Sequence, residues 1–348
     1  MSQEQTASYT AVTEMAIAAR LSEAACNSSY KIANLQPDHA RWRAYVDRFL
    51  MVIGVALMAA GVAAFIAWNW VDLDRLAKFA LIQSGILGSA VLTWRLGLNT
   101  IAGQSSLFIV AFLTGILLAL FGQVYQTGAD PYGLFLSWAI LILPLCVIGR
   151  QAGLWLLFHV LLVLTMIMYY TQVLHPPEGW WQLAQLLGPL VWLGTTVMDS
   201  TLASSVYALN VIGLVIWELG TSRGVPWMQG RSYPRLIALG AFSAVLPSTL
   251  VMILAAGFNE NAGLHFMSPL LLAVITVAGL WYYQFKRQDL MILTLCLLAG
   301  IFVATSFAIR QLMTGSDSLL LLALLIIAEV AGAAWWLKRV SQRWDSQT

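Results

Sequence analysis

Long apolar runs, separated by short polar links, occupy most of this chain from residue 49 onward. A helix needs about 20 apolar residues to cross the hydrocarbon layer of a membrane, and most of the runs approach this length. The pattern therefore predicts an all-α fold, a polytopic transmembrane helix bundle with ten or eleven spans. The apolar runs cover residues 49–68, 79–94, 101–122, 133–149, 153–171, 183–198, 202–217, 236–256, 267–285, 289–309 and 318–337.

The basic residues decide between the two counts. If all eleven runs cross and the N-terminus is cytoplasmic, eight of the 18 Lys and Arg residues lie inside and ten outside, against the positive-inside rule. If one run between Arg150 and Arg223 does not cross, the distribution becomes fifteen inside and three outside. Runs 183–198 and 202–217 are short, and only three residues join them. We therefore predict ten crossings, with both ends of the chain cytoplasmic.

The chain divides into three parts by polarity. Residues 1–48 are polar and are expected to form a cytoplasmic helical segment, with one helix over residues 10–26 and another beginning at Pro37. Residues 49–337 form the transmembrane domain, and residues 338–348 a short basic cytoplasmic tail. No cleavable signal peptide is visible, because the first apolar run begins only near Phe49. The first span is then its own insertion signal.

Composition supports the membrane class and excludes several others. The chain is 60% hydrophobic and only 10% charged, so its main solvent is lipid. A net charge of +2, spread over many loops, does not suggest nucleic-acid binding. The four histidines are widely scattered, and neither nucleotide-binding nor hydrolase motifs occur, so we predict no metal, cofactor or established catalytic site.

Polar side chains concentrate between the third and fourth runs, in the string FGQVYQTGADPYGLFLSW at residues 121–138. Gly128 suits the left-handed residue after a helix, and Asp130 followed by Pro131 suits an N-cap with proline in the first helical position. We therefore expect a tight helix-turn-helix corner at the external membrane face, with Trp138 and nearby tyrosines as interface anchors. Ala111, Gly115 and Ala119 should pack the preceding helix closely against a neighbour.

Two interpretations of this corner stay open. In the structural one, Asp130 caps a helix, the glutamines bond free carbonyls and the aromatic rings form a belt. In the functional one, the amide and phenol groups of Gln123, Tyr125, Gln126 and Tyr132 line a small polar pocket.

Two strings in this region resemble a bacterial family of predicted membrane proteins of unknown function. They are GQVYQTGADPYGLF at 122–135 and AWNWVDLDRLAKFAL at 67–81, and the resemblance covers residues 50–171 without the first 48. It implies a multi-pass protein of the bacterial inner membrane, without a known activity. It also implies a partner, a small envelope protein with a GDYXXLXY motif. The family pattern carries over to Asn69, Trp70, Lys78, Phe79, Gln123, Tyr125, Gln126, Gly128, Asp130, Pro131 and Tyr132.

A carboxylate lies inside the last apolar run. Glu329 precedes Lys338 by nine residues, which places it near the middle of the span. Such a group is costly in lipid unless it is neutral or paired. It either relays protons or binds a cation, or it is protonated and hydrogen-bonded to a neighbouring helix. His159 and Asn210, in other runs, are expected to join neighbouring helices, whereas Glu218 lies at a run end where it can reach water.

Three functions are compatible with these features. We favour a membrane-embedded subunit or scaffold that binds an envelope partner at the external corner. The alternative is a proton- or ion-coupled transporter or channel for a small solute or lipid, with Glu329 as the coupling group. The third is an interfacial lipid-modifying enzyme with Asp72, Asp74 or Asp130 as acid or base.

Overall fold

The computed structural model describes residues 15, 17–32, 42, 43, 46, 50, 57, 73–126, 128, 130–174, 200–255, 267–312 and 318–345. All elements within these ranges are helical. Contacts divide the chain into two units, Met1–Lys78 and Phe79–Thr348.

The first unit contains the helix α2 (Glu23–Ile32). Its first turn is capped by Ser22, whose Oγ accepts a hydrogen bond from the N–H of Ala25 at 3.4 Å. The predicted helix over residues 10–26 is therefore wrong in its bounds. Arg20 has a left-handed backbone with φ of 46°, and the turn at residues 19 and 20 separates the helical residues 17 and 18 from α2. The predicted helix start at Pro37 lies outside the described residues.

The second unit is a bundle of long apolar helices, and the prediction of a polytopic helical bundle is confirmed. Within the described ranges, nine helices are long and apolar enough to cross a membrane. They are α4 (Arg75–Leu96), α5 (Ile101–Tyr125), α6 (Pro131–Gly149), α7 (Ala152–Tyr169) with its π-helical end η1 (Tyr170–Leu174), α10 (Ser200–Ser222), α11 (Ser232–Ala255), α12 (Met267–Phe285), α13 (Leu290–Leu312) and α14 (Ser318–Asp345).

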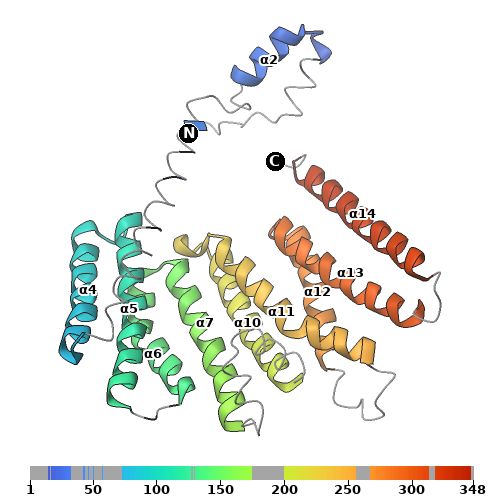
Figure 1. Cartoon of the computed structure of the whole chain (residues 1–348). Helices are drawn as coiled ribbons and strands as arrows, with labels where there is room; N and C mark the ends of the chain where they lie inside the picture. Colours follow the sequence, from blue (N-terminus) through green and yellow to red (C-terminus); the bar gives the residue numbers. More distant parts are fainter. Residues whose placement is uncertain are drawn as a thin grey trace. The chain divides into compact units, whose positions relative to one another are not determined.

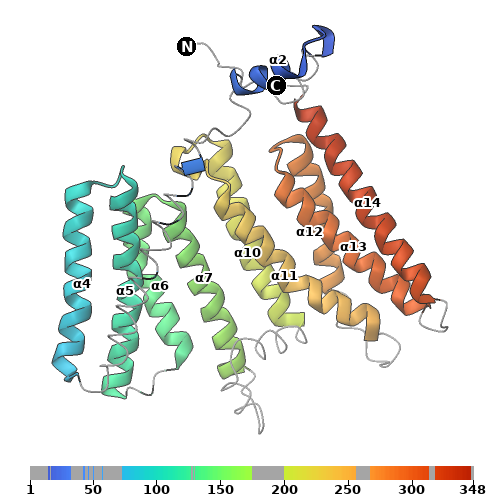
Figure 2. The same cartoon turned by 45° about the horizontal axis from the view of Figure 1, so that its top comes forward.

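Successive helices of this unit alternate in direction (Figures 1 and 2). The ends of α4, α6, α10, α12 and α14 therefore lie on one side, together with the starts of α5, α7, α11 and α13. We name this side the basic face, and the other side the opposite face. Arg310, near the end of α13, lies toward the opposite face. The basic face carries Arg95, Arg150, Arg223, Arg231, Arg235, Lys286, Arg287, Lys338, Arg339 and Arg343.

The alternating directions help to decide which of the two short runs, 183–198 and 202–217, crosses the membrane. Run 202–217 forms α10, which crosses from the opposite face to the basic face. Run 183–198 lies outside the described residues, but α7 ends and α10 begins on the same face. Arg223 and the later basic residues, except Arg310, consequently share a face with Arg95 and Arg150, as the ten-span topology requires. The first run, 49–68, falls almost wholly outside the described residues, so ten crossings remain a prediction.

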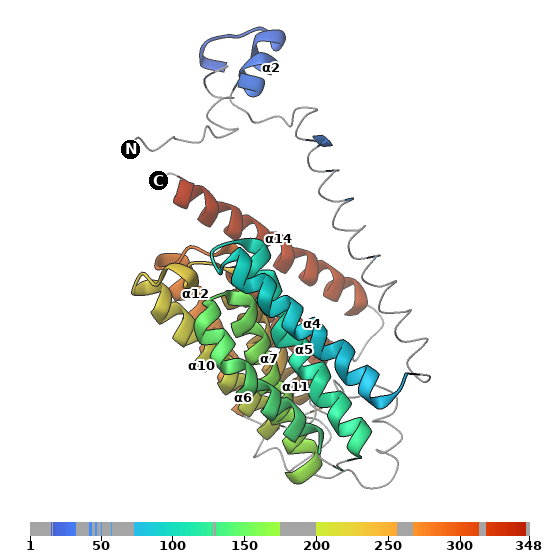
Figure 3. The same ribbon diagram turned by 90° about the vertical axis from the view of Figure 1, so that its left-hand side faces the viewer.

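Four buried clusters lie in the described part of this unit, and two of them are the largest. One lies among α5, α6 and α7 around Ala111, Ile142 and Leu154, and the other among α10 to α14 around Val245 and Leu293. Helix α7 joins them, since it contacts both α10 and α11. Helices α4 and α14 are at the two edges (Figures 1 and 3), and their apolar surfaces are left to lipid or to other chains.

The small residues of α5, Ala111 and Gly115, contact an aromatic side chain of α6 instead of the backbone of a neighbouring helix. Trp138 of α6 lies against Gly115, where a methyl group would overlap its indole, and its Nε1–H donates to the Ala111 carbonyl at 2.8 Å. Trp138 is thus an interhelical contact two turns inside α6, and its place as an interface anchor stays a prediction. Three prolines lie within apolar runs and are expected to kink or interrupt them. Pro144 and Pro247 lie inside continuous helices, and Pro189 lies outside the described residues.

Candidate functional site

The described residues of the turn between α5 and α6 include two with left-handed backbones and a proline. Helix α5 ends at Tyr125, and its C-cap residue Gln126 is left-handed with φ of 45° and ψ of 46°. Gly128 follows with φ of 57°, so the expected left-handed glycine is present, two residues beyond the C-cap. Asp130 is the N-cap of α6 with Pro131 after it, as predicted, but its side chain makes no capping hydrogen bond.

The polar side chains of this turn point outward. Gln123, Gln126 and Asp130 are exposed, and Tyr125 exposes 60% of its surface. The Tyr125 ring packs beside Phe121, with ring centroids 4.6 Å apart, and near Phe79 of α4 at 6.2 Å. Such exposure fits a docking surface, and the small polar pocket open to the external face stays a prediction.

The other predicted site residues are more dispersed. Tyr132 is half-buried and meets Tyr169 of α7 edge to face, with centroids 5.3 Å apart. Lys78 lies in the first turn of α4. Asn69, Trp70 and Asp72 lie outside the described residues. Asp74 is exposed just before α4, so the acids of the enzyme hypothesis are solvent-facing where they are described.

Glu329 has a hydrogen-bond partner on the neighbouring helix. The hydroxyl of Thr305 in α13 donates to its Oε2 at 2.9 Å, and the side chain is half-buried at the α13–α14 contact. One donor satisfies one carboxyl oxygen. The arrangement is compatible with both interpretations, a structural interhelical bond and a site for a proton or cation.

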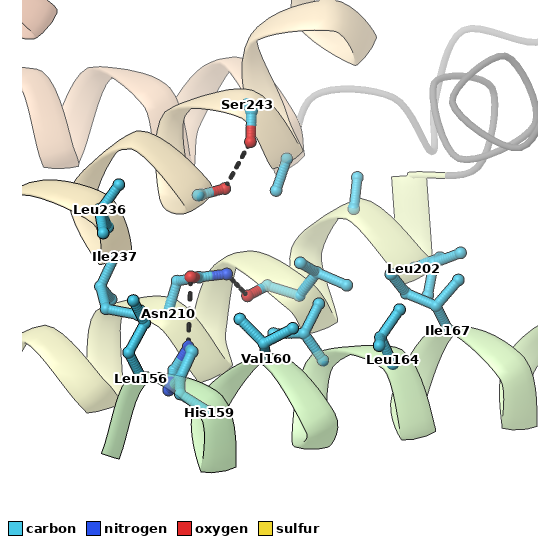
Figure 4. A pocket seen from close by; sticks show the side chains of 15 residues that line it. Leu156, His159, Val160, Leu164, Ile167, Leu202, Asn210, Leu236, Ile237 and Ser243 are labelled. Atoms are coloured by element: carbon cyan, nitrogen blue, oxygen red, sulfur yellow. Dashed lines mark hydrogen bonds between the residues drawn. The ribbon is translucent and has the colours of Figure 1, made fainter. Parts of the chain in front are cut away.

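A pocket of about 450 Å³ lies among α7, α10 and α11 (Figure 4). Its wall is mainly aliphatic, with Leu164, Ile167 and Leu202 toward the opposite face. His159 and Asn210 form the polar end, and both are nearly completely buried. The pocket therefore offers an apolar volume with a short row of hydrogen-bonding groups at one end.

These polar groups form a continuous chain across three helices. His159 Nε2 lies 3.3 Å from Asn210 Oδ1, and the Asn210 amide donates to the Val206 carbonyl at 2.8 Å. Because Asn210 Oδ1 can only accept, His159 Nε2 carries the proton, and Nδ1 is left to accept from the Tyr233 hydroxyl at 3.5 Å. The expectation that His159 and Asn210 join neighbouring helices is confirmed.

A second polar group, at the basic face, was missed from the sequence. Arg231 Nη1 lies 3.0 Å from Glu218 Oε1, and Arg231 Nε lies 2.9 Å from Asp289 Oδ2. Arg235 Nε reaches Asp289 at 3.1 Å, and Arg287 Nε reaches Glu218 at 3.5 Å. We call these five residues the ion network. It connects α10, α11 and the α12–α13 loop.

The acids of the ion network are buried, which corrects the expected exposure of Glu218. Glu218 is 6% exposed and accepts a hydrogen bond from the Tyr283 hydroxyl at 2.9 Å. Asp289 is 1% exposed and caps α13, since its Oδ1 accepts from the N–H of Met291 at 3.0 Å. One sequence feature could have indicated this site. Arg231 and Arg235 are four residues apart at the start of a helix, so both side chains can reach the same acidic partner.

The charges of the ion network stabilise one another. Burial by itself raises the pKa of the Asp289 carboxyl, but hydrogen bonds and charges from Arg235 and Arg231 outweigh it, so the pKa lies below its ordinary value. Burial lowers the pKa of the Arg231 guanidinium, while Glu218 and Asp289 raise it above its usual value overall. Asp289 and Arg231 therefore stay charged at neutral pH.

Residues 14–155 match a known family. Its description is Predicted membrane protein (DUF2157), a family of unknown function. The match includes residues 14–48, which the resemblance left out, while residues 1–13 stay outside it, and it ends at residue 155 instead of 171. No curated protein and no solved structure matches the chain.

The family match covers one of the sites described above and leaves the others outside. The turn between α5 and α6 lies inside residues 14–155, whereas the ion network, Glu329 and all residues that line the pocket lie outside. The match supports an integral membrane protein and adds no reaction. Among the described residues, no three His, Cys, Asp or Glu side chains group as metal ligands.

Proposed function

We propose that this integral membrane protein is a docking subunit that holds an envelope partner at the turn between α5 and α6. The observation that carries the proposal is the exposure of the turn, with Tyr125 60% exposed and Gln123, Gln126 and Asp130 facing outward. Left-handed Gln126 and Gly128, with Pro131 opening α6, fix the backbone that presents them. A rigid surface loses little conformational entropy on binding.

The chemistry of the turn suggests the kind of contact. An exposed tyrosine beside a carboxylate and two amides offers a large flat ring with hydrogen-bonding groups around it, as in many binding surfaces. The partner that the family resemblance implies is a small envelope protein with a GDYXXLXY motif. On the ten-span topology, the turn faces the compartment outside the cytoplasm.

Site-specific crosslinking in cells tests this function. A photoreactive residue replaces Gln126, with Arg223 on the basic face as the matched control position, and the chain is co-expressed with a GDYXXLXY protein. We expect a crosslinked product from position 126 alone, which the pair Tyr125→Ala and Asp130→Ala abolishes without lowering the protein level. Equal crosslinking from both positions, or none from position 126, would overturn the proposal.

One observation favours a second function, ion-coupled transport. The bond from Thr305 to Glu329 places a carboxyl group between two membrane-spanning helices, where it could exchange a proton or cation. Flux in proteoliposomes that Glu329→Gln abolishes, and that Thr305→Val reduces, would support transport. Absence of proton-coupled or cation-coupled flux with the wild-type chain would argue against it.

A further inference from the structure

An apolar groove between α10 and α12 ends beside the ion network. Its volume is about 340 Å³, and its wall is apolar almost throughout. It extends from Tyr207 and Val274 in the helix interiors to Leu219 and Tyr282 near the basic face. Half of the Val215 surface is exposed along it, so the groove is open to the surroundings of the helices. Its shape suits a hydrocarbon chain.

Each helix that borders the groove continues into a basic residue. The N–H of Arg223 donates to the Leu219 carbonyl at 3.1 Å, and the N–H of Lys286 donates to the Tyr282 carbonyl at 2.9 Å. These bonds place each cation one helical turn beyond a groove residue, on the same side of its helix. Arg223 and Lys286 are exposed, and neither forms an ion pair with another described residue.

The ion network adds an excess of positive charge at the same end. Glu218 borders the groove, but ion pairs with Arg231 and Arg287 neutralise its charge, and the Tyr283 hydroxyl donates a hydrogen bond to it. Arg287 uses only Nε in this pairing, and Arg231 Nη2 has no hydrogen-bond partner. Arg223, Lys286 and the ion network together carry five basic and two acidic side chains, a net charge of +3. An anion is attracted to this end.

We propose that the groove binds an anionic phospholipid, with an acyl chain between α10 and α12 and the phosphate at Arg223, Lys286 and Arg287. A chain in the groove meets apolar walls, while the phosphate sits one turn further out at the level of the membrane interface. Basic pockets between membrane-spanning helices bind lipid phosphates in this way. A zwitterionic lipid is less suited, because its ammonium group would add to the positive charge already present.

Lipid titration of the full chain in detergent, followed by native mass spectrometry, tests whether the basic residues bind the lipid phosphate. We compare phosphatidylglycerol with phosphatidylcholine of identical acyl chains. We expect preferential binding of phosphatidylglycerol, which Arg223→Gln with Lys286→Gln weakens about tenfold, since each basic residue near a lipid surface contributes substantially. The matched control, Arg95→Gln with Lys338→Gln, removes the same charge from the basic face on the edge helices and should leave the preference intact.

Two further measurements distinguish a site for a lipid from a site for free phosphate. Ala278→Trp fills the exposed side of the groove and is expected to reduce phosphatidylglycerol binding, whereas Ala331→Trp on α14 is not. Inorganic phosphate at millimolar concentration should compete poorly.

Either of two results would overturn the proposal. One is equal binding of both lipids with no effect of the Arg223 and Lys286 changes, which would make the groove an unselective apolar surface. The other is full competition by inorganic phosphate with no effect of Ala278→Trp, which would indicate a phosphate site without a lipid chain. Neither result bears on the docking turn, which lies on the opposite face.

Discussion

At the scale of single residues, Asp289 is a buried carboxylate with several hydrogen-bond partners. It is the N-cap of α13 and the shared acceptor of Arg231 and Arg235, with 1% of its surface exposed. Burying a carboxylate is costly, and only its combined partners offset that cost. Loss of the charge would leave two guanidinium groups at a partly buried site with fewer acceptors.

We expect Asp289→Asn to lower stability by about 3–5 kcal/mol at neutral pH, because breaking a buried ion pair leaves its partners uncompensated. The amide oxygen can still cap α13, so the change isolates the charge. The pKa of Asp289 is lower in the folded than in the unfolded chain, so its stabilisation is complete above the unfolded value of ~3.9 and is lost as the pH falls further.

Thermal unfolding in detergent at several pH values checks this prediction. The difference in melting temperature between wild type and Asp289→Asn should be constant near neutral pH and shrink as the pH falls below about 4. Arg95→Gln serves as a control on the same face and should follow the wild type. A difference that grows on acidification would contradict the assigned direction of the pKa shift.

At the scale of the elements, the α5–α6 turn shows which features local sequence can predict. Asp130 followed by Pro131 identified the start of α6, because proline restricts the backbone wherever it occurs. The outward direction of Gln126 and the absent Asp130 capping bond depend on how α5 and α6 pack, which the string alone does not contain. Trp138 shows the same limit, since its partner Ala111 lies 27 residues away.

Substitutions in the turn should separate stability from docking. Gly128→Ala is expected to cost about 1 kcal/mol, because a left-handed backbone is unfavourable for alanine. Asp130→Ala should cost well under the ~1 kcal/mol typical of a bonded N-cap, since that bond is missing. Melting temperatures of the purified variants measure both effects, with Gly133→Ala, whose added methyl would meet open space, as control. A larger loss from Asp130→Ala than from Gly128→Ala would show that Asp130 is structural.

At the scale of the whole molecule, composition and apolar run length were sufficient to predict the class of fold. The run pattern located each of the nine candidate spans, and its largest errors are at two helix ends, five residues before Ser222 of α10 and eight before Asp345 of α14. The ion network could not be predicted, because Glu218 and Asp289 are 71 residues apart and meet only through Arg231 between them. Long-range pairing of this kind follows from the order of helix packing.

Labelling of single cysteines in cells tests the topology. Arg223→Cys and Gln288→Cys lie on the basic face, and Gln126→Cys lies on the opposite face. If the basic face is cytoplasmic, a membrane-impermeant maleimide should label only position 126 in intact cells, and all three after permeabilisation. The native Cys146 and Cys296 are buried and give a low background, and Cys26→Ser removes the remaining thiol. Labelling of positions 223 and 288 in intact cells would reverse the orientation.

The ion network also makes the two ends of the α10–α13 group mechanically unequal. Five charged side chains fasten these helices at the basic face, whereas near the other end the described polar link between them is a single 3.4 Å bond from Arg310 to the Ile253 carbonyl. When the surrounding bilayer thins or thickens, helices relieve the mismatch by tilting. The helix ends at the basic face, joined by the ion network, then move least, and the ends at the opposite face move most.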